Sequence, residues 1–132
     1  MATTSAPVPG GSHVQAGTRQ AYIFATSRFT LLINSEESGG TSCTMEVISP
    51  PGDGANPHTH ADADEQFYVL NGDVTFRVGE ETYHASPGDV IFIPRGTVHS
   101  FKAGAAPAKM LATFTPGGIE NFFRAMGTPI HD

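Results

Sequence analysis

Two stretches of this chain, residues 52–72 and 88–99, constrain its fold and chemistry more than any other part. Together they carry three histidines and one glutamate beside short strand-like apolar runs: His58, His60, Glu65 and His99. His58 and His60 are two residues apart, so on an extended segment both imidazole rings point to the same face. Three imidazoles and one carboxylate on strands form the donor set of a mononuclear transition-metal site.

The composition indicates one small all-β domain. The chain has 132 residues, which is long enough for a sizeable core without metal or disulfide staples. Fifteen Gly and ten Pro, between many short β-branched and aromatic runs, are typical of a β-barrel or β-sandwich. The formal net charge of -6 disfavours binding to nucleic acid or to an anionic membrane surface.

Features of the chain that report on its compartment favour the cytoplasm. A single cysteine, Cys43, excludes an internal disulfide and fits a reducing compartment, where it is expected to be a small core residue. The N-terminus lacks the charged and apolar regions of a signal peptide. No apolar run approaches the roughly twenty residues needed to span a bilayer. We therefore expect a cytoplasmic protein.

Residues 1–20 are rich in Ala, Thr, Ser, Pro and Gly and cannot bury enough apolar surface to order themselves. We expect a flexible arm there, followed by a single domain over residues 21–132. The alternative is an arm that crosses to a partner subunit and adds an edge strand. His13 in this arm is expected to be solvated.

Alternating apolar and polar residues predict the strands of the domain. The predicted strands are residues 22–25, 28–33, 41–49, 67–70, 74–78, 82–85, 90–93 and, as the last strand, 109–115. Asn71-Gly72 is a strong hairpin signal, so the strands on its two sides are expected to pair with each other. The segment 34–40 is a turn by composition.

The end of the chain changes to a helical period. Ile119, Phe122, Phe123 and Met126 stand at i, i+3, i+4 and i+7, which predicts a short amphipathic helix over about residues 118–126, with Gly127 as its stop. Two interpretations stay open. The helix either only closes the barrel, or it is a lid whose phenylalanines line the mouth of a pocket.

The two stretches resemble both motifs of the cupin superfamily. The first fits G-x5-H-x-H-x4-E-x6-G from Gly52 to Gly72, and the second fits G-x5-P-x-G-x2-H from Gly88 to His99. The family's second motif often continues to an Asn, where this chain has Ala103. That Asn is not a ligand, so the departure leaves the metal site intact. The resemblance covers about residues 28–115.

This resemblance implies a cupin jelly-roll β-barrel with a short C-terminal helix, and a homodimer. It implies one divalent transition metal per chain (Fe, Ni, Mn, Co or Zn), held by His58, His60, Glu65 and His99, with Glu65 also the catalytic proton acceptor. Asp62 and Asp64 lack the spacing of Glu65 to Gly72 and are expected on the loop surface. His84 is expected to be exposed or hydrogen-bonded rather than a ligand.

The segment 116–129 resembles the C-terminal segment of bacterial quercetin dioxygenase-like cupins, with a similar Gly-Gly, Glu, Phe-Phe, Gly-Thr-Pro pattern. This favours a flat aromatic or polyketide-like substrate that carries a hydroxyl, with dioxygen as the second substrate. Five residues are expected to line the pocket: Phe67, Val69, Phe101, Phe122 and Phe123. Two alternatives stay open, namely a non-redox metal-dependent polyketide cyclase or isomerase, and a barrel that binds a small ligand without turnover.

Overall fold

The computed structural model describes residues 8–130 of the chain. Most of the elements within this part are strands, joined by short connections. In chain order they are β1 (Ala21–Phe24), β2 (Ser27–Ile33), α1 (Ser35–Ser38), β3 (Cys43–Ser49), β4 (Gly54–His58), β5 (Asp64–Asn71), β6 (Val74–Val78), β7 (Glu81–Ala85), β8 (Val90–Ile93), β9 (His99–Ala103), β10 (Ala108–Thr115), α2 (Glu120–Met126) and β11 (Thr128–Ile130).

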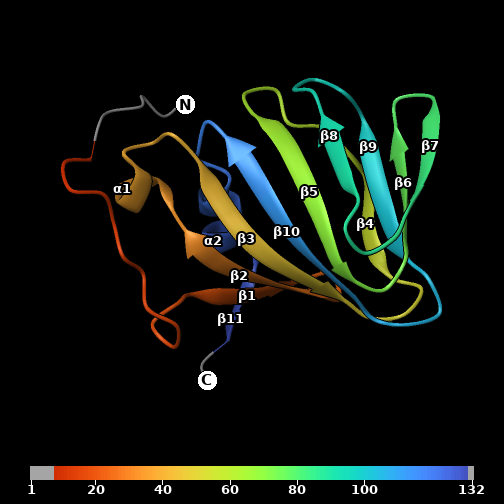
Figure 1. Ribbon diagram of the computed structural model, residues 1–132, viewed down its shortest axis with the longest axis horizontal. Coiled ribbons are helices and arrows are strands. Elements are labelled where there is room, and N and C mark those ends of the chain that lie inside the picture. Colours follow the sequence, from red (N-terminus) through yellow and green to blue (C-terminus); the bar gives the residue numbers. More distant parts are fainter. Residues whose placement is uncertain (1–7, 131–132) are drawn as a thin grey trace.

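The strands form two antiparallel sheets that face each other. One sheet has the order β11-β1-β2-β3-β10-β5-β8, and the other has the order β4-β9-β6-β7. In Figure 1 the smaller sheet lies at the right of the view, beside β5 and β8, with α1 at the opposite end. Neighbours in each sheet are mostly distant in the sequence, as in a jelly roll. The predicted jelly-roll β-barrel with a short C-terminal helix is confirmed.

Residues alternate between core and surface along the strands, as the period-2 pattern predicts. In β3 the side chains of Cys43, Met45 and Val47 are buried, and the residues between them are half-buried. Burial also raises the pKa of the Cys43 thiol, so Cys43 is an inert core residue, as expected. Phe67 and Phe101 come from different sheets, and their ring centroids are 5.3 Å apart.

The predicted hairpin around Asn71-Gly72 is wrong. The strands β5 and β6 follow each other in the chain but lie in different sheets, because β5 pairs with β10 and β8 while β6 pairs with β7 and β9. Gly72 has φ +79, and a Cβ there would lie 2.5 Å from the carbonyl oxygen of Pro107. The turn signal is therefore real, but the turn carries the chain from one sheet to the other.

Two further predictions about connections need correction. The segment 109–115 is not the last strand, because β11 pairs with β1 after the C-terminal helix, with Ala21 opposite Ile130. The predicted turn over residues 34–40 contains the helical turn α1. The side chain of Asn34 accepts a hydrogen bond from the Glu37 N–H, and the Glu37 side chain accepts one from the Asn34 N–H. This capping box explains why a turn-like composition forms a helix here.

The C-terminal helix α2 lies within its predicted range and packs beside β1 and β11. Gly127 follows its last residue, and the Gly127 N–H donates to the carbonyl of Phe123. Phe123 is 7% exposed, whereas Phe122 is 43% exposed. The helix therefore packs Phe123 against the barrel and leaves Phe122, the residue before it, at the surface.

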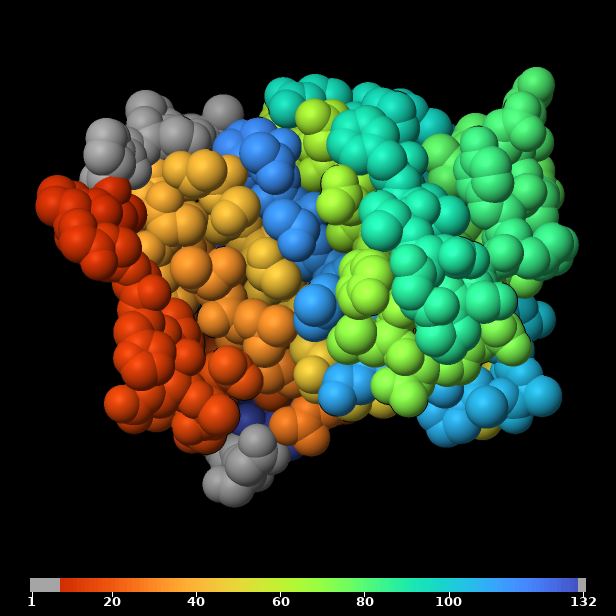
Figure 2. Space-filling view, viewed as in Figure 1, coloured from red at the N-terminus to blue at the C-terminus, as the bar shows by residue number. Residues whose placement is uncertain are grey.

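The N-terminal arm is described from residue 8 onward, so residues 1–7 of the predicted arm lie outside the described residues. Residues 8–20 form no helix or strand, and in Figure 2 they run down one side of the molecule, coloured red. Their contacts with the domain include a hydrogen bond from Ser12 Oγ to the Glu37 carbonyl and one from the Leu31 N–H to the Gln20 carbonyl. The Gln20 side chain also accepts from Tyr22 and Arg124. His13 is exposed, as expected. The flexibility of the arm and its crossing to a partner stay predictions.

No helix within residues 8–130 is long and apolar enough to cross a membrane.

Candidate metal centre

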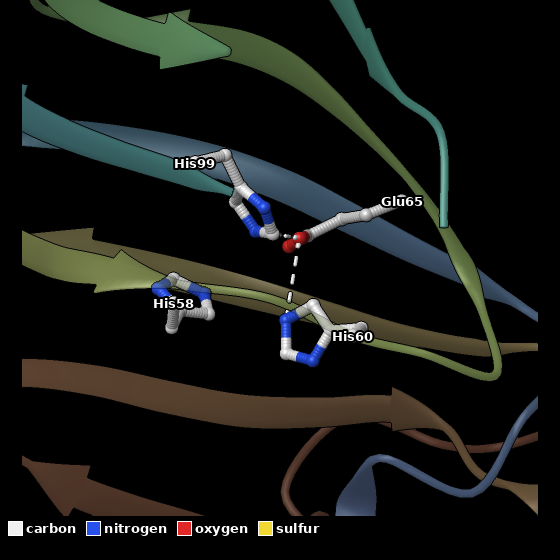
Figure 3. A group of neighbouring side chains, drawn as sticks. All are labelled: His58, His60, Glu65 and His99. Carbon is white, nitrogen blue, oxygen red and sulfur yellow. Dashed lines mark ion pairs between the residues drawn. The ribbon is translucent and has the colours of Figure 1, made fainter. Parts of the chain in front are cut away.

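The four residues that the two stretches predict as metal ligands lie close together between the two sheets. His58 is the last residue of β4 and lies opposite His99, the first residue of β9. Glu65 is in β5 of the other sheet, and His60 lies in the connection between β4 and β5. One ligand atom from each of the four side chains lies within 4.8 Å of all the others. Figure 3 shows the three rings and the carboxylate pointing toward a common centre.

The carboxylate of Glu65 lies closest to two of the rings. Its Oε1 is 3.0 Å from His99 Nε2 and 3.6 Å from His60 Nε2, the two contacts that Figure 3 marks with dashed lines. The His58 and His99 ring centroids are 4.3 Å apart, and those of His60 and His99 are 5.2 Å apart. Such spacings bring the four groups close enough to hold one ion together.

Backbone carbonyls orient two of the histidines. His58 Nδ1 is 2.6 Å from the Asn56 carbonyl oxygen, and His99 Nδ1 is 2.9 Å from that of Thr97. A carbonyl oxygen only accepts hydrogen bonds, so in both rings Nδ1 carries the proton and donates it. Nε2 then keeps its lone pair, which is the tautomer that a metal ligand needs.

Burial dominates the electrostatics of the cluster. It lowers the pKa of His58, and together with His58 and His99 it lowers the pKa of His60 to about 4. Both rings are therefore neutral at pH 7. Burial raises the pKa of Glu65. For His99, burial acts to lower the pKa, but the contacts with Glu65 and the Thr97 carbonyl outweigh it and the pKa is raised.

Two buried atoms of the cluster have no hydrogen-bond partner in the described part of the chain, Glu65 Oε1 and His99 Nε2. They are 3.0 Å apart, but they do not meet in hydrogen-bond geometry. Buried polar atoms are rarely left without a partner. Because both atoms belong to ligand types and face the same centre, a cation would satisfy them together, and the residues present fit a bound metal ion.

A cavity of about 290 Å³ opens from the cluster toward α2. Its walls are mainly apolar, and its lining residues include neither Lys, Arg nor Asp. The lining residues outside the cluster are Phe24, Ala25, Phe29, Met45, Val47, Gly54, Ala55, Asn56, Pro57, Phe67, Phe101, Ala112, Phe114, Ile119, Phe122 and Phe123. The volume is at the lower end of the roughly 300–1,000 Å³ of small-molecule pockets.

Four of the five residues predicted for the pocket lie on this cavity: Phe67, Phe101, Phe122 and Phe123. Val69 does not, because it is fully buried farther along β5. Contact of any of these residues with a substrate stays a prediction. The sequence did not predict Phe24, Phe29 and Phe114 as cavity residues. Which face of their strands points into the barrel cannot be assigned until the sheet order is known.

Other polar residues near the two motifs lie outside the cluster. Asp62 is exposed, and Asp64, the first residue of β5, pairs with Arg95, with Asp64 Oδ1 3.2 Å from Arg95 Nε. His84 is exposed, and its Nδ1 is 3.1 Å from Thr75 Oγ1. Asp62 therefore lies at the surface as expected, but the expected loop position of Asp64 is wrong, because Asp64 is half-buried and begins a strand. Glu65 is the one carboxylate in the cluster of the described residues.

Comparison with known proteins places this geometry in a family. Residues 45–114 match the family described as "Cupin domain". The quercetin 2,3-dioxygenase of Bacillus subtilis is 36% identical over 94 residues, which are 71% of this chain and 28% of that protein. The quercetin 2,3-dioxygenase of Aspergillus japonicus is 29% identical over 81% of this chain and 33% of that protein. The chain thus matches about a third of the length of these curated relatives, or less.

Among solved structures, KdgF from Halomonas sp. is similar with a TM-score of 0.72 at 19% identity. The similarity covers 85% of this chain and 98% of that one. At this level of identity it shows the fold alone.

Proposed function

The chain belongs to the cupin family, and from this premise we propose that it is a metal-dependent dioxygenase. The proposed substrate is a flavonol-like or other aromatic or polyketide-type small molecule that carries a hydroxyl group. One observation carries the proposal: a buried cluster of three histidines and one glutamate opens into an apolar cavity with aromatic walls. The distant relationship to two quercetin 2,3-dioxygenases supports the choice of reaction.

His58, His60, Glu65 and His99 would hold the metal ion. A bound redox-active metal would supply the Lewis acidity that favours a deprotonated substrate hydroxyl, and the electron exchange with dioxygen that oxidises or cleaves the substrate. The Nδ1–H groups of His58 and His99 hold their rings in the ligating tautomer through the carbonyls of Asn56 and Thr97.

Glu65 is the proposed proton acceptor. It is the one carboxylate among the residues that line the cavity, and it is buried at the inner end of that cavity beside the three rings. A substrate hydroxyl that enters between the aromatic walls would find no carboxylate in the cavity lining other than Glu65. Position within reach of the substrate is the first requirement of a general base, and the place of Glu65 on the cavity wall supports this role.

The charge of the cavity favours an uncharged ring system over an anionic substrate. Apart from the proposed metal ion, the cavity offers no cationic group, because neither Lys nor Arg is among the lining residues. A second carboxylate of a dicarboxylate that does not reach the metal would therefore lose its hydration without gaining a cationic partner. A flat aromatic molecule loses little by the same transfer, and it gains contacts with rings such as Phe67 and Phe101.

The test begins with metal content per chain on protein purified without added metal or an affinity tag. About one iron, nickel, cobalt or manganese ion per chain supports the proposal, and dioxygen uptake is then measured on flavonols and polyketide phenols. Uptake that requires both metal and phenol is the expected result.

Other results would redirect the proposal. One functional zinc per chain without dioxygen uptake would contradict a dioxygenase and favour the non-redox cyclase or isomerase. A chain that takes up no metal on titration would leave the ligand-binding barrel. Zinc occupancy alone is insufficient, because zinc also loads sites of this donor type.

A further inference from the structure

Glu120 is a fully buried carboxylate that the metal centre does not use. It is the first residue of α2 and has 0% exposure. Its Oε2 accepts a hydrogen bond from the Ser35 N–H at 2.5 Å, and its Oε1 accepts one from the Gly118 N–H at 2.7 Å. Burying a carboxylate costs free energy unless hydrogen bonds of this kind satisfy it. The buried position of Glu120 therefore depends on these two N–H donors.

The Ser35 bond joins the C-terminal segment to a distant part of the chain. Ser35 is the first residue of α1, 85 positions before Glu120. Nearby, the Gly117 N–H donates to the Gly40 carbonyl at 3.0 Å. A Cβ at Gly117 would collide with the Ser35 hydroxyl and with the backbone of Ser42, so the two segments pack without spare room. The start of α2 is therefore fastened to the loop that contains α1.

The residues beside Glu120 form one wall of the cavity. Ile119, Phe122 and Phe123 all line it. The Phe123 ring packs against Phe29 with centroids 4.4 Å apart, and Phe122 meets Phe24 edge-on at 5.0 Å. Any movement of the start of α2 would move these rings, because they are on the same two turns of helix.

Phe122 is one of the residues that lie between the cavity and a second hollow. This hollow, of about 310 Å³, is lined by residues 59–63 and 116–119 and by Phe122. The cavity and the hollow share His60, Ile119 and Phe122. A displaced Phe122 ring would join the two spaces and admit a larger molecule to the cluster.

The other contacts of α2 with the α1 region are weaker anchors. Arg124 Nη1 is 3.1 Å from Glu36 Oε1, but the Glu36 side chain is 67% exposed. Exposed ion pairs contribute little, and water replaces them easily. Water does not reach the buried Glu120 in the same way, so its hydrogen bond from the Ser35 N–H is the stronger polar contact between α2 and the α1 region.

We propose that Glu120 is a positioning residue that holds the aromatic wall of α2 across the mouth of the metal cavity and thereby limits the size of the ligand that reaches the cluster. The nature of the ligand, an aromatic molecule that binds the metal through oxygen, rests on the proposed function. The anchoring itself rests on the two hydrogen bonds and the packing at Gly117.

The experiment compares two chelating phenols on cobalt-loaded protein, 4-nitrocatechol with one ring and alizarin with three fused rings. Glu120→Gln keeps the shape of the side chain but turns an NH₂ group toward one of the two backbone N–H donors. The matched control is Glu36→Gln, which removes the exposed ion pair of the same helix. Dissociation constants for both phenols and for cobalt are measured, with amide hydrogen exchange at Ser35 and Gly118.

In Glu120→Gln, exchange at Ser35 and Gly118 is expected to rise. The preference for 4-nitrocatechol over alizarin is expected to fall about tenfold, while the affinity for cobalt stays within about twofold of wild type. Glu36→Gln should match wild type in all of these. Phe122→Ala, at an exposed position, should lower the same preference without raising exchange at Ser35.

An unchanged preference and unchanged exchange in Glu120→Gln would overturn the proposal. So would a loss of cobalt affinity equal to the loss of ligand preference, because Glu120 would then support the whole fold. If Glu120→Gln does not fold, a wild-type preference in Phe122→Ala overturns the proposal, and a lowered preference supports it. If wild-type protein binds neither cobalt nor phenol, the proposed function fails, and exchange at Ser35 and Gly118 still decides the anchoring.

Discussion

The ligand cluster and the aromatic wall that faces it are built in opposite ways. The cluster is polar and buried, and two of its atoms, Glu65 Oε1 and His99 Nε2, lack a hydrogen-bond partner within the described residues. The wall around Phe122 and Phe123 is apolar and packed, and the one buried charge at its base, Glu120, is satisfied by two N–H donors. A bound ion would satisfy the buried polar atoms of the cluster, whereas the carboxylate at the base of the wall already has its hydrogen-bond partners.

The two regions also depend on different parts of the chain. The ligands come from β4, β5, β9 and the connection after β4, which strand pairing such as that of His58 with His99 holds in place. The wall depends on α2, which is fastened to α1 and packs on β1 and β2 through Phe24 and Phe29. This difference predicts that changes in the cluster affect metal binding, and that changes in the wall affect stability and ligand choice.

The largest effect is expected for His99→Ala. It removes a buried candidate ligand, so the loss of metal affinity should exceed the roughly 10–100-fold that loss of an outer-shell partner costs, and activity should vanish. Metal titration with a competing chelator measures this. His84→Ala is the matched control, since His84 lies on a strand outside the cluster. A fully loaded, active His99→Ala protein would refute the ligand assignment.

Phe123→Ala tests the wall. The ring is 7% exposed and packs against Phe29, so its loss should cost about 3–5 kcal/mol in the free energy of unfolding. Phe122→Ala, at the exposed neighbour, should cost only about 1 kcal/mol. Urea denaturation of the metal-free variants measures both. Equal losses would mean that the two rings contribute alike and that Phe123 is not the packed member.

Glu65→Gln should separate the two regions most clearly. The variant keeps the shape of a ligand but loses its charge, so metal affinity should fall by at least roughly tenfold, together with activity. The metal-free protein should be no less stable than wild type, because burial disfavours the Glu65 charge and its Oε1 has no hydrogen-bond partner within the described residues. Calorimetric titration and urea denaturation check the two results. Wild-type activity in this variant would exclude an essential proton transfer by Glu65.

Glu36→Gln should have the smallest effect. The exposed pair with Arg124 contributes about 0.2–1 kcal/mol, as such pairs usually do. A hydrogen bond from its own backbone N–H and the Arg124 contact lower the pKa of Glu36, so this stabilisation is present above the unfolded-state pKa. It is lost as the pH falls through the lower folded-state pKa. Denaturation from pH 7 into acid should show the two proteins converge; a gap that widens in acid would contradict this sign.

Sequence reasoning predicted the cluster better than the connections. The short spacing of His58, His60 and Glu65 was enough to predict that their side chains lie together. The side chains of nearby residues on an extended chain can point in only a few directions. The Asn71-Gly72 turn was located correctly, but its partners were not. A turn signal reports local backbone conformation, while pairing depends on which strands occupy the two edges of β5.

The sequence by itself determined the all-β class, the alternation that buries Cys43, Met45 and Val47, the helical end of the chain, and the four candidate ligands. The first three follow from residues within a few positions of one another, and the ligands follow from two such stretches, 52–72 and 88–99, and their resemblance to the two cupin motifs. Only the tertiary structure decided that β5 and β6 belong to different sheets, that β11 returns to β1, and that Phe24 and Phe29 face the cavity. It also decided that Glu120 meets Ser35 across 85 positions. Such contacts arise from the closure of long loops around a shared core, which no local pattern encodes.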